Sequence, residues 1–318
     1  EKQDVVVGPP ALGTPKARAT MPTKLALDDV LRVNHLQAEA THNSYHLAPD
    51  PYVVPEWDYS MPTLTEQLRL GVRQLELDVH LEGGELRVYH AIGLDDGTTC
   101  ATLAACLDEV AAWSGRYPAH LPLYVQIEIK DDVGGDPFVD PPALDDVILA
   151  HGPAPVTPAE VRGAHATLAE AMAAEGWPTL GETRGRAIYG LDDAGDHRDA
   201  YRARGEGVLF VNAAPTDPDA ALAIVNDPAS PDLPAVLAAG LLVRLFADTA
   251  EDDAATSQAD RDRALRAGGH WLSTDRPDDT DTIEGFAIPG GTPARCNPVT
   301  APPECTSSAV EDPAFFLY

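Results

Sequence analysis

The sequence predicts an α/β protein that folds as a (β/α)8 barrel of the TIM type, or as a distorted form of it. The chain has 318 residues, which suits one large domain of this kind. Short β-rich runs alternate with segments of helical periodicity, and eight such runs can be counted. A doubly wound open sheet is the alternative, but the sequence contains neither a GxGxxG motif nor a P-loop, which removes the commonest ligands of that fold.

The predicted strands are separated mostly by helical segments, so most neighbouring strands should run parallel. The one connection that looks like a hairpin is "HLEGGEL" at 80–86. The strands are predicted at 36–41, 73–80, 86–91, 123–130, 186–191, 207–213, 241–247 and 270–275.

The predicted helices carry start and stop signals. "TLTEQLRLG" opens with Thr63 and has Glu66 three residues later, which is the pattern of a capping box. "TLAACLDEVAAWSG" has apolar residues at helical spacing and stops at Gly115. "TPAEVRGAHATLAEAMAAEG" is predicted as one helix over 157–176, and "SQADRDRALRAGG" as another that ends at a glycine pair.

Around the barrel, predicted at 31–284, we expect an N-terminal arm at 1–30 and a C-terminal extension at 285–318 that ends in "PAFFLY". The four cysteines form two close pairs, Cys100 with Cys106 and Cys296 with Cys305. Neither pair has the spacing of a zinc site, so two local disulfides in a secreted protein are expected, against four free thiols in a cytosolic one.

The composition limits the partners. A formal net charge of −29 repels nucleic acid, so no nucleic-acid partner is expected. No run of 18 apolar residues is present, and the start "EKQDVVVGPP" looks like that of a trimmed mature protein. We therefore expect a secreted protein, and a monomer because no sustained heptad pattern is visible. The acidic runs, "LDDG" among them, are expected to be solvated loops.

Polar residues recur at the carboxyl ends of the predicted strands, where barrel enzymes place their chemistry. His42 and Asn43 follow the first strand, Glu76 and Asp78 lie two apart on the second, and His90 ends the third. Charged groups inside apolar strands are costly to bury unless they are paired or bound to a metal.

The later strands repeat the pattern. Glu128 and Lys130 lie two apart near the end of the fourth predicted strand, Arg244 lies in the seventh, and Asp275 ends the eighth. Carboxylates with an amide form an all-oxygen set that suits Ca²⁺ or Mg²⁺ and does not suit Zn²⁺. Together with two histidines and two cations, such a set suits phosphoryl transfer.

The motifs "THNSY", "QLELDVH", "VYH" and "IEIK", in this order and at these spacings, resemble the catalytic X region of phosphatidylinositol-specific phospholipases C. The likeness is closest to the secreted bacterial, calcium-dependent branch. It is strong over 35–130 and weaker over 240–278, where "VRLFAD" and "HWLSTDRP" resemble the last two strands of this barrel superfamily. Residues 131–240 contribute little to it.

The resemblance implies roles for the site residues. His42 would stabilise the pentavalent phosphorane, and His90 would act as the general acid toward the leaving group. Glu76 or Glu128 would take the proton of the inositol 2-hydroxyl. The implied cofactor is Ca²⁺, with Mg²⁺ less suited, and its implied ligands are Asn43, Glu76, Asp78 and Glu128.

The implied product is an inositol 1,2-cyclic phosphate with diacylglycerol, with later hydrolysis to inositol 1-phosphate as an option. Lys130, Arg244 and Asp275 would contact the substrate. Lys130 could instead pair with a neighbouring carboxylate, and Arg244 with Asp275 or Asp248. Because no pair of lysines for ring 4- and 5-phosphates is evident, unphosphorylated phosphatidylinositol or a soluble glycerophosphoinositol is the expected substrate.

Two other interpretations stay open. One is a glycerophosphodiester phosphodiesterase or a sphingomyelinase D-like lyase, and the other is an inactive barrel that binds inositol lipids or calcium. A segment at 50–62 follows the first strand and could touch lipid transiently or pack on the barrel rim. Its apolar residues are Tyr52, Val53, Val54, Trp57, Tyr59 and Met61.

Overall fold

The computed structural model describes residues 24–130, 142–278, 284–290 and 293–311. Most of the predicted N-terminal arm and the "PAFFLY" end lie outside the described residues, so the division at 30 and 284 remains a prediction. Within the described part, no helix has the length and apolar character needed to cross a membrane.

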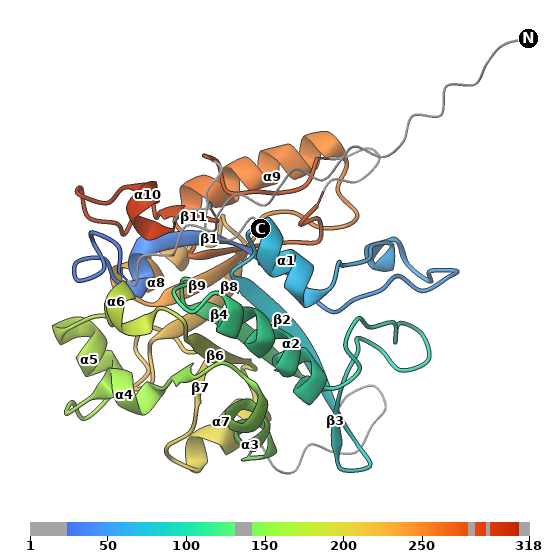
Figure 1. The fold of residues 1–318 in the computed structure, drawn as a ribbon, viewed down its shortest axis with the longest axis horizontal. Helices are drawn as coiled ribbons and strands as arrows, with labels where there is room; N and C mark the ends of the chain where they lie inside the picture. Colours follow the sequence, from blue (N-terminus) through green and yellow to red (C-terminus); the bar gives the residue numbers. More distant parts are fainter. Residues whose placement is uncertain (1–23, 131–141, 279–283, 291–292, 312–318) are drawn as a thin grey trace, which may run out of the picture.

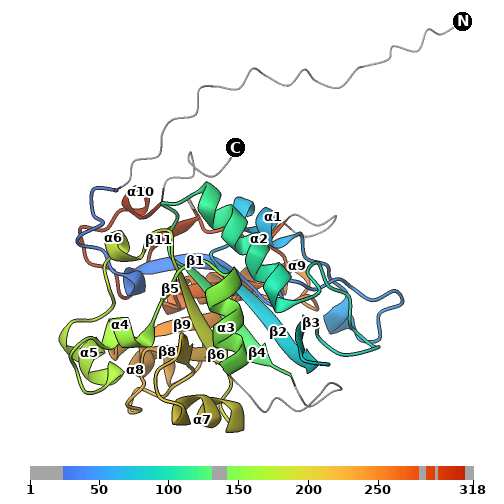
Figure 2. The same cartoon turned by 60° about the horizontal axis from the view of Figure 1, so that its bottom comes forward.

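A curled sheet of parallel strands forms the centre of the molecule, and helices lie outside it (Figures 1 and 2). Going around, the strands are ordered β7, β6, β4, β2, β1, β10, β9 and β8. A single parallel bridge between Asn212 and Leu222 joins β7 to β8, the two ends of this series. The bounds are β1 Leu36–Thr41, β2 Gln74–Glu82, β4 Leu123–Ile129, β6 Ala187–Asp192, β7 Leu209–Val211, β8 Leu222–Asn226, β9 Leu242–Phe246 and β10 Trp271–Thr274.

The predicted fold class is confirmed, but one strand was assigned wrongly and another was missed. β3 (Glu85–Val88) pairs antiparallel with the end of β2 and projects from the sheet as the second arm of a hairpin. The eighth parallel strand is instead β8, "LAIVN", which has an irregular register near Asn226 and an exposed end. β5 (Pro155–Val156) and β11 (Ala294–Cys296) are further short strands.

Ten α-helices lie within the described residues. Their bounds are α1 Leu64–Leu70, α2 Leu103–Arg116, α3 Pro142–His151, α4 Pro158–Arg162, α5 Leu168–Ala174, α6 Leu180–Thr183, α7 Asp196–Ala203, α8 Leu233–Ala238, α9 Ala254–Ala267 and α10 Ser307–Val310; the 3-10 helices η1 and η2 span Val33–His35 and Pro55–Trp57.

The capping box at Thr63 and Glu66 is present at the start of α1. The single helix predicted over 157–176 is wrong, because α4 ends at Gly163 and α5 starts a new N-cap at Thr167. Gly163 has φ +55°, in the left-handed region that terminates a helix and that glycine adopts without a steric penalty.

Strand alternation sorts the side chains of β2 and β4 onto two faces. Leu75, Leu77 and Val79 belong to the same apolar cluster as Leu107 and Val110 of α2. The residues between them in β2 are polar, so Glu76 and Asp78 face away from these helices. The same alternation in β4 directs Glu128 to that polar side, which is the inside of the curled sheet.

The C-terminal extension is tied to the barrel by strand pairing and polar contacts, and each disulfide is local to one segment of the chain. Both predicted disulfides, Cys100–Cys106 and Cys296–Cys305, are present. β11 pairs antiparallel with β1. Beyond it, the buried carboxylate of Glu311 accepts hydrogen bonds from Arg73 Nε at 2.9 Å and Nη2 at 3.2 Å.

Glu311→Ala should lower the free energy of unfolding by about 3–5 kcal/mol, because it leaves the buried guanidinium of Arg73 without its counter-ion. Urea denaturation followed by circular dichroism measures the loss. Glu304→Ala, at an exposed position of the same extension, is the matched control. Equal stability of the two variants would show that the extension is not anchored through this pair.

A buried histidine makes the fold sensitive to acid. His270 Nδ1 accepts from the Val243 N–H at 2.9 Å and Nε2 donates to the Asn34 carbonyl at 3.0 Å, so the ring is neutral. Burial lowers the pKa of His270 from 6.5 to about 4, although the Asn34 hydrogen bond opposes this. Between these two values the unfolded chain binds a proton that the folded chain does not, so stability falls as the pH falls.

His270→Gln should therefore flatten the dependence of unfolding free energy on pH between 6.5 and 4, by up to about 1.4 kcal/mol per pH unit. Urea titrations at several pH values, with EGTA throughout, measure this slope. His151→Gln, at a partly exposed position, should leave the slope unchanged. A slope that is identical in wild type and His270→Gln would contradict the account.

Candidate active site

The end of β1 turns sharply at the predicted His-Asn pair. Asn43 is buried and has φ +41°, a left-handed conformation that asparagine tolerates better than most residues. The His42 N–H donates to the Thr274 carbonyl at 3.1 Å, and the Ser44 N–H donates to the Glu76 carbonyl at 3.0 Å. These bonds fix the turn against the neighbouring strands β10 and β2.

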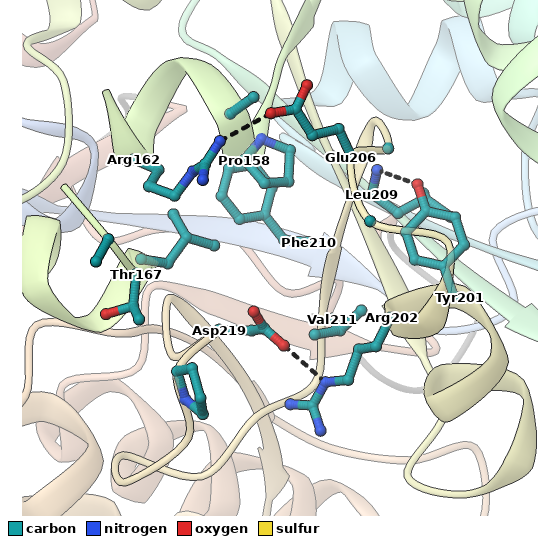
Figure 3. Close-up of a pocket in the computed structure, with 16 residues that line it drawn as sticks. Pro158, Arg162, Thr167, Tyr201, Arg202, Glu206, Leu209, Phe210, Val211 and Asp219 are labelled. Carbon is teal, nitrogen blue, oxygen red and sulfur yellow. Dashed lines mark hydrogen bonds and ion pairs between the residues drawn. The ribbon is translucent and has the colours of Figure 1, made fainter. Parts of the chain in front are cut away.

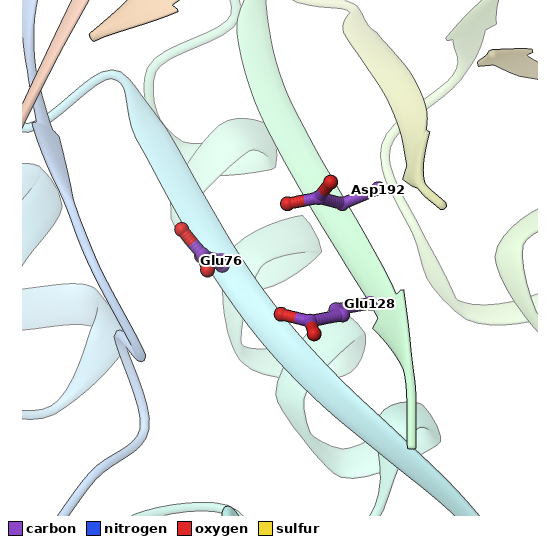
Figure 4. Close-up of side chains that lie close together, drawn as sticks. All are labelled: Glu76, Glu128 and Asp192. Atoms are coloured by element: carbon purple, nitrogen blue, oxygen red, sulfur yellow. The ribbon is translucent and has the colours of Figure 1, made fainter. Parts of the chain in front are cut away.

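Three carboxylates from neighbouring strands meet beside this turn. Glu76, Glu128 and Asp192 come from β2, β4 and β6, and each offers an oxygen within 4.8 Å of the others (Figure 4). The strand register accounts for the grouping, since Glu128 is paired with Asp78 on one side and with Asp192 on the other. We call Glu76, Asp78, Glu128 and Asp192 the carboxylate cluster.

Two cations neutralise part of this cluster. Arg244 Nη2 donates to Glu76 Oε2 at 2.7 Å and to Ser273 Oγ at 3.1 Å. Lys130 Nζ lies 2.6 Å from Glu128 Oε1 and 3.5 Å from Asp78 Oδ2. Both cations therefore pair with carboxylates, and the partner of Arg244 is Glu76 rather than Asp275 or Asp248.

The negative charge of the cluster is only partly compensated. Neither oxygen of Asp78 accepts a hydrogen bond from the part of the chain that the structure describes. Burial raises the pKa of Asp78 to about 7, with Lys130 acting in the opposite direction. Burial and the charges of Glu76 and Glu128 likewise raise the pKa of Asp192 to about 7. Buried carboxylate oxygens without donors, beside further carboxylates, fit a hard divalent cation.

His42 is held by a buried carboxylate. Its Nδ1 lies 2.9 Å from Asp275 Oδ1, and its ring packs edge-on against Phe246. Burial disfavours the charged ring, but the carboxylates of Asp275 and Glu76 outweigh it and raise the pKa of His42 to about 9. Asp275 Oδ2 also accepts from the Ala250 N–H at 2.8 Å. Both oxygens of Asp275 are thus engaged within the protein, and its contact with substrate remains a prediction.

His90 does not end a barrel strand as predicted. It lies beyond the end of β3, in the loop that leads back from the hairpin. Its Nδ1 lies 2.8 Å from Asp95 Oδ2, and the Trp57 ring stands edge-on to it at 5.6 Å between centroids. Burial raises the pKa of Asp78, and a charge on His90 lowers it, in the same direction as Lys130 but by less.

Sequence reasoning missed two residues. Asp192 ends β6 and carries the same signal as the other strand-end carboxylates, which was available in "RAIYGLD". Asp95 belongs to the run "LDDG", and the expectation that this run is solvated is wrong for Asp95, which is fully buried between two histidines. A charge run alone does not show which of its members turns inward.

For the segment at 50–62 we considered contact with lipid and packing on the barrel rim, and each fits part of the segment. Tyr52 and Val53 are exposed, whereas Met61 is buried. Ile92 and Leu94, on the loop after β3, are exposed as well. The two loops lie on the same side of the molecule in Figures 1 and 2.

A separate cavity of about 280 Å³ lies between β7 and helices α4, α5 and α7 (Figure 3). Its arginines are already paired, Arg162 with Glu206 and Arg202 with Asp219. None of the predicted site residues lines it.

A curled α/β sheet that carries carboxylates and two cations on its inner side, with two histidines on the loops beside them, is typical of barrel phosphodiesterases that use a metal ion. The chain belongs to the calcium-dependent phosphoinositide phospholipase C family, whose model matches residues 80–298. The predicted enzyme class and calcium dependence are thereby confirmed. His42, Asn43, Glu76 and Asp78 precede the matched stretch, so their roles are argued from geometry.

Solved structures support the fold. The chain is similar to a calcium-dependent phosphatidylinositol-specific phospholipase C from Streptomyces antibioticus, at 20% identity and a TM-score of 0.59, over 77% of this chain and 95% of that one. It is also similar to a calcium-dependent phosphoinositol-specific phospholipase C from Pseudomonas sp., in a myoinositol complex, at 16% identity and a TM-score of 0.59, over 87% and 100% of the two chains. A comparison with curated proteins found no match.

Asp78→Asn should stabilise the calcium-free protein by about 1–3 kcal/mol, because it removes a buried negative charge that lies beside Glu76 and Glu128 and that Lys130, 3.5 Å away, offsets only in part. Urea denaturation in EGTA measures the change. Asp146→Asn, at an exposed position of α3, controls for the loss of one negative charge from the whole chain. A destabilised Asp78→Asn variant would contradict the view that this carboxylate is strained without a cation.

Proposed function

We propose that the chain cleaves phosphatidylinositol, or a soluble glycerophosphoinositol, by attack of the inositol 2-hydroxyl on phosphorus. One observation carries this proposal: the inside of the sheet holds a carboxylate cluster, and His42 and His90 are each hydrogen-bonded to a buried aspartate beside it. The products are an inositol 1,2-cyclic phosphate and diacylglycerol. A later hydrolysis of the ring would reverse the proton transfers.

Asn43, Glu76, Asp78 and Glu128 would hold the calcium ion, and Asp192 lies close enough to Glu76 and Glu128 to join them. When bound, calcium lowers the pKa of the inositol 2-hydroxyl and offsets negative charge on the phosphate oxygens. The donor-free oxygens of Asp78 are the observation that favours a cation here.

Side chains of the protein carry out the proton transfers. Glu76 or Glu128 takes the proton of the 2-hydroxyl as its oxygen forms a bond to phosphorus. Glu128 is the more exposed of the two, with 31% of its side chain accessible against 3% for Glu76. His42 uses Nδ1 for Asp275, which leaves Nε2 to donate to a phosphorane oxygen. His90 gives the Nε2 proton to the diacylglycerol oxygen as its bond to phosphorus breaks.

Lys130 and Arg244 lie where they can contact the substrate phosphate or ring. Both are engaged by carboxylates, so little cationic charge remains for ring phosphates. This balance favours phosphatidylinositol without 4- or 5-phosphates. The exposed Tyr52, Val53, Ile92 and Leu94 support transient contact with a lipid surface. Two disulfides support a secreted protein, and we propose that it acts as a monomer.

Phosphorus NMR of the enzyme with phosphatidylinositol micelles tests the proposal. A cyclic inositol phosphate resonance should appear with calcium and be absent with excess EGTA. His42→Ala and His90→Ala should each slow its formation by about 10²–10⁴-fold, the range for a positioned proton donor. Choline or glycerol phosphate from other lipids, or no turnover in either tube, would contradict the proposed reaction.

A further inference from the structure

A buried polar chain extends from His90 away from the carboxylate cluster. Asp95 Oδ2 lies 2.8 Å from His90 Nδ1, and Asp95 Oδ1 lies 2.8 Å from His46 Nε2. Asp95 and His46 are fully buried, whereas 26% of the His90 side chain is accessible. The chain therefore has one end in the site and the other inside the protein.

His46 is hydrogen-bonded at both ring nitrogens. Its Nδ1 lies 2.9 Å from the Tyr59 carbonyl oxygen, which can only accept, and its Nε2 faces the Asp95 carboxylate. The two acceptors lie on opposite sides of the ring, so they fix its orientation. Burial raises the pKa of Asp95, but hydrogen bonds from His46 and His90 outweigh it and lower that pKa overall. Asp95 is thus an ionised acceptor for both rings.

The backbone holds these residues in place. The Asp95 N–H donates to the Ala91 carbonyl at 2.8 Å, and the Ala91 N–H donates to the Asp95 carbonyl at 2.8 Å. Between the two loops, the Leu47 N–H donates to the Gly97 carbonyl at 3.2 Å and the Thr99 N–H to the Tyr45 carbonyl at 2.7 Å. The loop after β1 is in this way bonded to the loop that carries His90.

The same loop after β1 surrounds His90 on another side. Trp57 stands edge-on to the His90 ring, and the Tyr59 ring stacks on His46 at 4.3 Å between centroids. The His90 ring is therefore restrained by Asp95, which is hydrogen-bonded to Nδ1, and by the ring of Trp57. Both restraints depend on residues of the segment 46–59.

We propose that Asp95 and His46 are positioning residues that orient His90 for transfer of a proton from Nε2 to the leaving-group oxygen. The proposal rests on the acid role of His90 in the proposed function. Asp95 accepts the Nδ1–H whether His90 carries one proton or two, so Nε2 stays directed at the reacting atoms. The hydrogen bond to His46 lowers the pKa of Asp95 and holds its carboxylate in place where water does not reach it. Neither residue touches the substrate in this scheme.

Leaving-group dependence separates this role from a merely structural one. Phosphatidylinositol releases an alcohol that needs a proton, whereas inositol 1-(4-nitrophenyl phosphate) releases a nitrophenolate that does not. Asp95→Asn and His46→Gln should each lower kcat on phosphatidylinositol by about 10–100-fold and change kcat on the nitrophenyl substrate by less than about threefold. His90→Ala should show the same selectivity with a larger loss. The double variant Asp95→Asn/His46→Gln should lose no more than Asp95→Asn alone.

The control is Asp108→Asn, which alters an exposed His-Asp pair with His151 and should not affect either substrate. Equal losses on both substrates in Asp95→Asn, or no loss on either, would overturn the proposal. If His90→Ala itself fails to discriminate between the substrates, the acid role in the proposed function is wrong instead. His46→Gln keeps Asp95 in place, so it decides the question if Asp95→Asn does not fold.

Discussion

The rest of the structure depends on mutual repulsion among carboxylates held in the middle of β2 and at the ends of β4 and β6. Like charges that are close together and out of water are costly unless cations or donors compensate them. Here the strand register forces the contact, since Glu128 is paired with Asp78 on one strand and with Asp192 on the other. The backbone of the barrel thus imposes a local concentration of negative charge.

The residues around the cluster compensate part of this negative charge. Arg244 reaches across from β9 to Glu76, and Lys130 lies between Glu128 and Asp78. Two cations against four carboxylates leave an excess that a divalent ion would offset, which agrees with the calcium dependence of the family. His42 and His90 lie beside the carboxylate cluster. Each is hydrogen-bonded to a buried aspartate, which fixes the ring nitrogen that faces the site.

Strand periodicity made most of the sheet predictable from the sequence. Seven of the eight parallel strands, and Glu76, Asp78 and Glu128 on one side of two of them, could be inferred from alternation and from the position of polar residues in apolar runs. β8 was missed because "LAIVN" is short and its far end is exposed, which gives no two-sided apolar signal. The predicted strand that ends at His90 was assigned to the barrel because a hairpin arm and a barrel strand have the same alternation of apolar residues. Only the strands with which they form hydrogen bonds distinguish them.

Residues that depend on tertiary contacts were harder to predict. Asp95 was not recognisable within an acidic run, since its burial arises from His46 on another loop. The break at Gly163 was hidden by good helix formers on both sides. Long-range packing decides the burial of Asp95, whereas at Gly163 the local break signals, the glycine and the N-cap at Thr167, were outweighed by the helical pattern around them.

The carboxylate cluster should bind one calcium ion. Isothermal titration calorimetry of the metal-free protein with Ca²⁺ tests it most directly, because it requires no substrate and no turnover. The account predicts one bound ion per chain, with binding abolished in Asp78→Asn and retained in the exposed-site variant Asp146→Asn. Absence of binding to the wild-type protein, or undiminished binding to Asp78→Asn, would contradict it.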